Sequence, residues 1–151
     1  MATKYRGTKS EVRSLSAYVK LMRATEAVTT KINRHLAGSG LTISQFGVLE
    51  ALYHLGPLCQ RDIAKKILKS TGNITVVIDN LEKRGLVARV RDAEDRRFFI
   101  IRLTNDGEKL ISGIFPSHSE AIIREMGVLS EEEQIELGRI CKKLGLSSKV
   151  E

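Results

Sequence analysis

The chain of 151 residues has no apolar run long enough to cross a membrane, only two prolines and only two cysteines. A membrane-spanning helix needs about 20 predominantly apolar residues, and the first residues, MATKYRGTKSEVRS, contain no apolar segment resembling a secretion signal. Cys59 and Cys141 stand far apart and form no C-x-x-C motif, so neither a disulfide framework nor a thiolate zinc site is indicated. We therefore expect a cytoplasmic protein with reduced thiols.

The sequence also lacks the short motifs of common enzymes and metal proteins. His35, His54 and His118 fall in three different predicted helices, and no H-x-x-x-H pair, G-x-S-x-G motif or phosphate-binding glycine loop is present. This predicts no catalytic residue, no metal site and no cofactor. A metal site assembled in the fold from His, Asp and Glu side chains stays open as an alternative.

The composition is that of a globular protein whose charge is unevenly distributed. With 42% hydrophobic and 28% charged residues, the chain is long enough for one compact domain or two lobes that share helices. Residues 1–36 carry eight Lys or Arg against two Glu, residues 59–104 carry eleven against six acidic residues, and residues 105–151 carry six against nine. The first two blocks are basic, but a basic surface alone does not predict nucleic-acid binding.

Apolar residues at spacings of three and four predict six helices. The first four are expected at 10–36, 45–55, 59–68 and 74–85. Thr42 or Ser44 can cap the second helix, and Gly56-Pro57 ends it. The fifth helix follows Thr104, where Asn105 and Glu108 fit a capping box, and the sixth covers 130–146, where Ser130 and Glu133 fit another.

Between the fourth and fifth helices the apolar period changes to that of strands. LVARVR and RFFIIRLT are rich in β-forming residues and flank a charged turn, which predicts an antiparallel hairpin. The residues expected on its inward face are Leu86, Ala88, Val90, Phe99, Ile101 and Leu103. Two short helices with a tight turn between them and a hairpin directly after form the winged helix-turn-helix pattern, whose second helix fits the major groove.

Three stretches carry a resemblance to a known family. They are LTISQFGVLEALYHLGPL, RDIAKKILKSTGNITVVIDNLEKRGLVARV and DAEDRRFFIIRLTNDGEKLI. Over nearly its whole length the chain resembles the multiple antibiotic resistance regulator (MarR) family. The D-x-x-D-R-R turn before an L-T that opens a helix, together with LEKRGLV, makes this a specific signal.

The resemblance implies a mainly α fold with a small β-hairpin wing, a winged helix-turn-helix lobe at 42–104, and a helical dimerisation region at 10–36 and 105–148. It implies a homodimeric transcriptional regulator of double-stranded DNA, usually a repressor. The apolar stripes of the first and last two helices support a dimer independently, because one lobe of this size cannot cover them. A two-fold dimer would bind a pseudo-palindromic operator.

The turn of the hairpin is the first candidate DNA contact. The resemblance implies that a wing-tip arginine enters the minor groove, and Arg96 and Arg97 supply cations that a narrow minor groove attracts. Asp92 and Asp95 can hold the turn and orient a guanidinium. The alternative is a solvated turn whose Asp and Arg residues merely pair with each other.

The second candidate contact is the fourth helix with the turn before it. Asn73 can pair with adenine, and Thr71 or Thr75 can bind a phosphate or touch a thymine methyl. Helix capping is the other reading of Ser70 and Thr71. The base-reading candidates are Ser70, Thr71, Gly72, Asn73, Thr75 and Val76. The phosphate-binding candidates, which a merely solvated helix face would explain equally well, are Arg61, Lys65, Lys66 and Lys69.

The resemblance also suggests a pocket for a small phenolic or aromatic effector between the dimer and DNA-binding lobes. By position Tyr18, Met22, Phe46 and Tyr53 are its candidate lining, with ordinary core packing as the alternative. An effector shifts DNA binding only if it binds one spacing of the two lobes more tightly than the other.

Two other functions are compatible with the sequence. Cys59 could make the protein a thiol-based redox sensor if a helix N-terminus lowers its pKa, although a free cysteine is more often a small core residue. An architectural DNA-binding protein would show weak sequence preference and steep salt dependence, whereas a regulator favours its operator by roughly a thousandfold or more.

Overall fold

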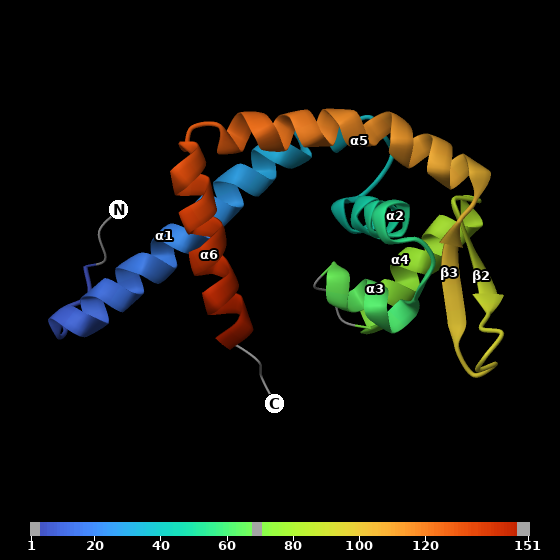
Figure 1. Cartoon of the computed structure of the whole chain (residues 1–151), viewed down its shortest axis with the longest axis horizontal. Coiled ribbons are helices and arrows are strands. Elements are labelled where there is room, and N and C mark those ends of the chain that lie inside the picture. The colour runs from blue at the N-terminus through green and yellow to red at the C-terminus, as the bar shows by residue number, and fades with distance from the viewer. Residues whose placement is uncertain (1–3, 68–70, 148–151) are drawn as a thin grey trace. The chain divides into compact units, whose positions relative to one another are not determined.

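The computed structural model of the chain describes residues 4–67 and 71–147. Helices precede and follow a small antiparallel sheet (Figure 1), so the predicted mainly helical fold with a β-hairpin wing is confirmed. The elements are α1 (Lys9–Ile32), η1 (Asn33–Leu36), α2 (Ile43–Leu55), β1 (Leu58–Cys59), α3 (Gln60–Lys66), α4 (Thr71–Lys83), β2 (Val87–Arg91), β3 (Phe99–Leu103), α5 (Asn105–Met126) and α6 (Glu131–Ser147). None of the described helices is both long and apolar enough to cross a membrane.

The chain divides into two compact units. The central unit is Asn33–His118, and the terminal unit combines the residues up to Ile32 with those from Ser119 onward. The boundary between the units falls within α5, so the central unit extends beyond residue 104. The assignment of DNA binding to 42–104 and of dimerisation to 10–36 and 105–148 stays a prediction.

The core of the central unit is built from α2, α3, α4 and the sheet. Val48 and Leu49 of α2, Ile63 of α3 and Ile74 of α4 are all fully buried. The sequence positions these helices through local signals. Thr42 and Gln45 form a reciprocal capping box at the start of α2. Gly56 ends the helix with a φ of 77°, a conformation that costs glycine little.

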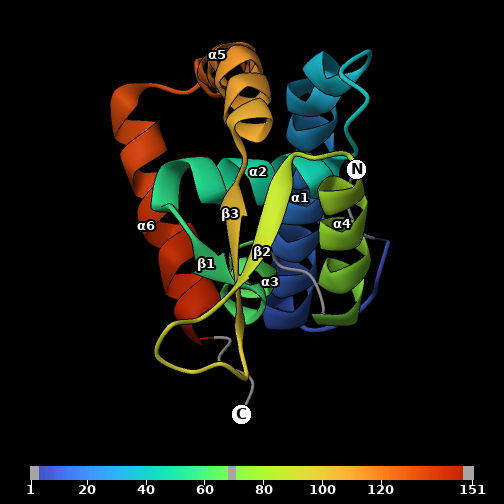
Figure 2. The same cartoon turned by 90° about the vertical axis from the view of Figure 1, so that its right-hand side faces the viewer.

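The sheet has the order β1-β3-β2, with β3 between its two antiparallel partners (Figure 2). Arg89 lies opposite Ile101, and Val87 lies opposite Leu103. Directly paired residues share a face, so Val87 and Arg89, rather than Ala88 and Val90, lie on the face of buried Ile101.

The predicted inward face of β2 is therefore wrong, and an ion-pair cluster explains why. The guanidinium of Arg89 contacts Asp79 and Glu82 of α4, at 2.9 Å in the case of Glu82. Its charge is thus neutralised on the inner side of the hairpin, where the alternation rule expects an apolar residue. Val90, which was predicted to face inward, is instead 45% exposed.

The passage from β3 into α5 is tight. Thr104 caps α5, because its Oγ1 accepts a hydrogen bond from Gly107 N at 3.0 Å, and its hydroxyl donates to Gly85 O. The predicted capping role of Asn105 is thus wrong by one residue. A Cβ added at Gly107 would lie 1.9 Å from the carbonyl oxygen of Leu86. Only glycine allows this approach.

The terminal unit contains α1, the end of α5 and α6. Ser130 and Glu133 form the predicted capping box of α6, with hydrogen bonds of 2.9 and 3.2 Å between them. Lys31 of α1 pairs with Glu125 of α5 at 3.1 Å. Neither α1 nor α6 contains a buried residue, so their apolar side chains are left exposed within one chain.

Candidate nucleic-acid interface and cavity

Helix α4 buries one face and exposes the other. Ile74, Ile78 and Leu81 are fully buried, while Asn73 and Val76 are exposed. Thr75 is exposed as well, and its Oγ1 accepts a hydrogen bond from Gln60 Nε2 of α3.

This hydrogen bond links the first residue of α3 to the N-terminal half of α4. Gln60 was not among the predicted site residues. Its role depends on how two helices pack, which residue spacing does not show.

Of the other residues predicted to contact DNA in this region, the structure describes some and not others. Thr71 and Gly72 form the first turn of α4, whereas Lys69 and Ser70 lie outside the described residues. Arg61 and Lys65 of α3 are exposed and make no ion pair within 4–67 and 71–147. Both cations are therefore available to phosphate groups.

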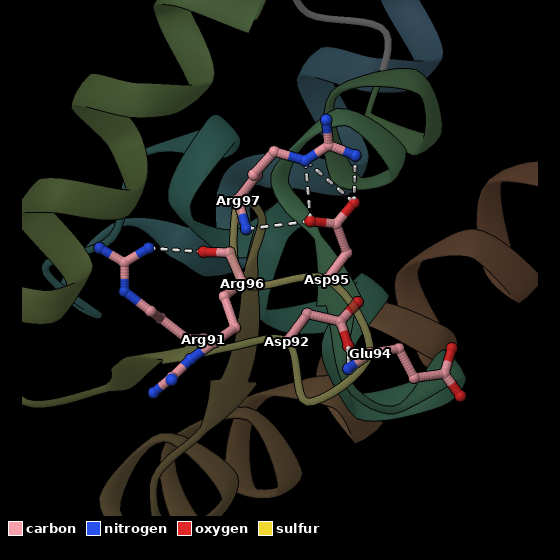
Figure 3. Close-up of polar contacts among 6 residues, drawn as sticks. All are labelled: Arg91, Asp92, Glu94, Asp95, Arg96 and Arg97. Atoms are coloured by element: carbon pink, nitrogen blue, oxygen red, sulfur yellow. Dashed lines mark hydrogen bonds and ion pairs between the residues drawn. The ribbon is translucent and has the colours of Figure 1, made fainter.

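The wing tip is organised by its two aspartates (Figure 3). Asp95 accepts hydrogen bonds from Arg97 Nε at 3.0 Å, from Arg97 Nη2 at 2.7 Å and from the Arg97 backbone N–H at 3.1 Å. These bonds, above all those from the side chain, lower the pKa of the Asp95 carboxyl below its ordinary value. Asp92 accepts a bond of 2.9 Å from the Glu94 backbone and so shapes the turn.

Arg96 and Arg97 are held in different ways. The guanidinium of Arg97 is paired with Asp95, as the solvated-turn alternative expects. The side chain of Arg96 is exposed and has no partner among the described residues. Its backbone carbonyl accepts a hydrogen bond from Arg91 Nη1, which fixes the main chain at the tip (Figure 3).

Arg91 is a second residue that the sequence reasoning missed. Its guanidinium lies 4.7 Å from the centre of the Phe99 ring, its cross-strand neighbour. The pairing of Arg91 with Phe99 could have been predicted from the hairpin register, because the two residues flank the turn symmetrically. Arg91 thus braces the backbone from which the Arg96 side chain projects.

A cavity of about 450 Å³ lies within the central unit. Residues from the start of η1 to the middle of α5 line it: Asn33, Ile43, Ser44, Phe46, Gly47, Glu50, Ala51, His54, Leu55, Lys66, Ile67 and His118. Most of its wall is apolar, with a few polar groups from α2, α3 and α5. This composition is typical of pockets that bind small organic molecules.

Of the four residues predicted to line an effector pocket, Phe46 borders this cavity. Tyr53 is 38% exposed, and its ring lies 5.1 Å from that of His54. Tyr18 and Met22 lie on α1 in the terminal unit, where they are 61% and 49% exposed. Those two stay candidates for an effector site by position alone.

The three histidines, dispersed in the sequence, are all part of the aromatic cluster beside the cavity. The His118 ring lies 4.9 Å from that of His35 and 4.6 Å from that of Phe46. His54 packs against Phe115 at 4.5 Å. Burial, together with the charge of His35, lowers the pKa of His118 below its ordinary value. His118 is therefore uncharged at neutral pH.

Glu50 is the acidic residue of the cavity wall. Its Oε1 lies 3.8 Å from His118 Nε2, which is beyond hydrogen-bond distance. Burial raises the pKa of the Glu50 carboxyl above its ordinary value. The described residues contain no cluster of His, Cys, Asp and Glu that could hold a metal ion.

Cys59 lies at the start of α3 and is half-buried. It lines a separate cavity of about 330 Å³ beneath the wing, together with Arg61, Phe98 and Phe99 among others. Its side chain makes no capping bond to the helix. Redox sensing through Cys59 thus gains no specific support from the structure.

Comparisons with known proteins agree on one family. A family model described as MarR family matches residues 41–98. The HTH-type transcriptional regulator MhqR of Bacillus subtilis (strain 168) is 37% identical over 137 residues, which cover 91% of this chain and 94% of that protein.

Two solved structures at 27% identity share the fold with a TM-score of 0.76. NadR in complex with 4-hydroxyphenylacetate matches over 100% of both chains. Bordetella bronchiseptica BpsR, whose DNA binding is regulated by 6-hydroxynicotinic acid, matches over 85% of this chain and 98% of its own.

Proposed function

Because the chain belongs to the MarR family of transcriptional regulators and is not an enzyme, we propose that it is a homodimeric repressor of its target genes. In this proposal each protomer contacts one half of a pseudo-palindromic operator through α4 and the wing. A small hydroxylated aromatic compound releases the repressor from DNA.

The observation that carries the DNA-binding proposal is the contrast between the two wing arginines. Asp95 pairs with Arg97, whereas the guanidinium of Arg96 has no partner among the described residues and projects from a turn whose main chain is hydrogen-bonded by Arg91. A preorganised backbone with a free cation at its tip suits insertion into a narrow, electronegative minor groove. The exposed face of α4, with Asn73 and Val76, suits the neighbouring major groove.

The dimer proposal rests on the exposed apolar residues of the terminal unit. Leu137, Ile140 and Leu144 of α6 lie at helical spacing and are 38%, 48% and 52% exposed. A contiguous apolar stripe of this kind favours association. A second copy of the chain would cover the stripe and place two α4 helices about one turn of DNA apart.

The effector proposal rests on the cavity of the central unit. Its volume is within the range of pockets that bind small organic molecules, and its mixture of apolar and polar lining suits an aromatic compound with a hydroxyl group. NadR and BpsR, which share the fold, are named with hydroxylated aromatic acids. Binding in the cavity would then favour the state of the dimer that does not fit the operator.

The test begins with selection of genomic fragments by the full-length protein, followed by affinity measurements on the enriched site. We expect one symmetric motif, bound at least roughly a thousandfold more tightly than random DNA. Arg96→Ala should weaken binding by about tenfold without loss of fold. Enrichment without a motif would favour an architectural protein instead and would refute the regulator proposal.

A further inference from the structure

A side-chain hydrogen bond connects the two helices of the helix-turn-helix. Nε2 of Gln60, the first residue of α3, donates to Oγ1 of Thr75 on α4. The backbone is fixed beside each end of this bond. Cys59, just before Gln60, pairs with Ile100 of β3, and Ile74, just before Thr75, is fully buried. The bond therefore joins two side chains whose Cα atoms are held in place by the sheet and the core.

The bond restrains the side chain of Thr75 about χ1. A threonine in a helix divides between two χ1 rotamers, whereas valine and isoleucine populate essentially one. An Oγ1 atom that accepts a hydrogen bond from α3 selects the rotamer in which it points toward Gln60, whose half-buried side chain has little freedom to follow it elsewhere. Because the oxygen and the methyl group are both attached to Cβ, the same bond fixes the position of the Cγ2 methyl.

Thr75 belongs to the exposed face of α4. Its neighbours Asn73 and Val76 are exposed as well, while Ile74 is fully buried on the opposite face. The hydroxyl oxygen of Thr75 is engaged by Gln60, so the methyl is the group that this side chain can offer to a base. In the major groove a threonine methyl contacts the C5 methyl of thymine.

From this arrangement we infer that Gln60 is a positioning residue for base recognition, which holds the Thr75 methyl against the C5 methyl of one thymine in each half-site. This inference rests on the proposed operator contact through α4. It adds the base that Thr75 reads and the residue that orients Thr75. Gln60 acts through Thr75 and needs no base contact of its own. Burial of one methyl group contributes about fourfold in affinity.

The test uses the full-length protein and the operator that it enriches from genomic fragments. Each thymine of a half-site is replaced in turn by deoxyuridine, which lacks only the C5 methyl, and affinity is measured by fluorescence anisotropy. We expect one position at which the replacement weakens wild-type binding by about fourfold per half-site. Thr75→Ser keeps the hydroxyl but lacks the methyl, so it should bind the thymine and uracil operators equally at this position.

Variants of Gln60 separate positioning from a general role in stability. Gln60→Ala, and Gln60→Met, which keeps the length of the side chain without its donor, should each release the Thr75 rotamer. The thymine-to-uracil affinity ratio at the same position should then fall roughly by half. Adding Thr75→Val to either variant should restore the ratio, because valine carries two methyl groups in one dominant helical rotamer. A merely structural role of Gln60 would not be rescued in this way.

Arg61→Ala is the matched control on the same helix. Arg61 follows Gln60 directly, is exposed and is a candidate for phosphate binding. Its loss should weaken binding to the thymine and uracil operators alike and should reduce the salt dependence by about one released counterion. The thymine-to-uracil affinity ratio should stay as it is in the wild type.

The possible failures of this inference and of the regulator proposal are distinct. An operator with no thymine whose methyl effect depends on Thr75 would overturn the reading of thymine while leaving the regulator proposal in place. An unchanged ratio in both Gln60 variants, or a lowered ratio that Thr75→Val does not restore, would overturn the positioning role of Gln60. A wild-type protein that enriches no motif at all would overturn both proposals.

Discussion

The central unit gathers fifteen buried hydrophobic residues of the described chain into one cluster, whereas α1 and α6 of the terminal unit contain no buried residue. Both regions have amphipathic helices, so the difference is one of available partners. In the central unit, α2, α3 and α4 cover one another and the sheet. In the terminal unit the apolar stripes lack a cover of this kind, and a second chain would supply it.

This contrast implies that the two units differ in what stabilises them. The central unit owes its stability to contacts within one chain, so its weak points are internal packing and strain. The terminal unit would owe much of its stability to association, so its weak points are exposed apolar residues. Substitutions that affect one unit and spare the other can test this division.

The largest effect is expected from placing charges in the apolar stripe of α6 that Leu137, Ile140 and Leu144 form. The double variant Ile140→Glu/Leu144→Glu should sediment as a monomer at micromolar concentration and should lose about a hundredfold or more in operator affinity, because the second half-site is no longer held nearby. Lys142→Glu, which places the same charge away from the stripe, is the control and should stay a dimer. A dimeric double variant would show that the interface lies elsewhere.

A methyl group at Gly107 should disturb the central unit instead. Gly107→Ala places a Cβ where the carbonyl oxygen of Leu86 lies, and we expect a loss of about 3 kcal/mol in the free energy of unfolding. Urea denaturation would measure it. Gly113→Ala, in the same helix and with open space around the added Cβ, serves as control. Equal stability of the two variants would disprove the tight approach.

A smaller and more specific effect is expected on the α4 surface. Asn73→Ala should leave the fold and the dimer intact and should relax base preference at one position in each half-site, by about 1–3 kcal/mol. Selection from a randomised operator library would reveal it. An unchanged motif would exclude Asn73 from base reading.

The smallest effect concerns the pH dependence of the central unit. Because the pKa of His118 is lowered in the fold, the unfolded chain takes up a proton at a higher pH than the folded chain does. Stability should therefore fall as the pH drops below about 6.5, the ordinary value for histidine. The raised pKa of Glu50 acts in the opposite direction, so the comparison requires a variant.

The appropriate comparison is between the wild type and His118→Phe over pH 5–7.5. The wild type should lose more unfolding free energy on acidification than the variant does, because only the wild type carries the buried imidazole. Parallel curves for the two proteins would argue that His118 does not titrate differently in the folded and unfolded states.

Local rules predicted the parts of the fold that local contacts determine. The capping signals at Thr42 and Ser130 and the stop at Gly56 depend on residues within three or four positions, and the structure agrees with them. The inward face of β2 was mispredicted because Arg89 finds its partners on α4, which the period of a strand does not reveal. The two-residue strand β1 was missed because its partner, Ile101, is about forty residues away.

The candidate sites likewise divide into features that local sequence motifs reveal and features that depend on how the elements pack. The wing arginines and the exposed residues of α4 could be proposed as DNA contacts from sequence, because a turn and a short helix carry recognisable motifs. Of the residues that line the cavity, Phe46 alone was among those predicted for an effector pocket, since Glu50 and His118 come together only when α2 packs near the middle of α5. Three histidines that appear unrelated in sequence therefore proved to be neighbours in one cluster.

Hydroxyl-radical footprinting of the operator with the wild type and with Arg96→Ala tests the role of the wing most directly. We expect two symmetric minor-groove protections in the wild-type complex, and their loss in the variant at protein concentrations that still protect the major groove from methylation. Unchanged minor-groove protection by Arg96→Ala would contradict the claim that this unpaired arginine carries the wing into the DNA.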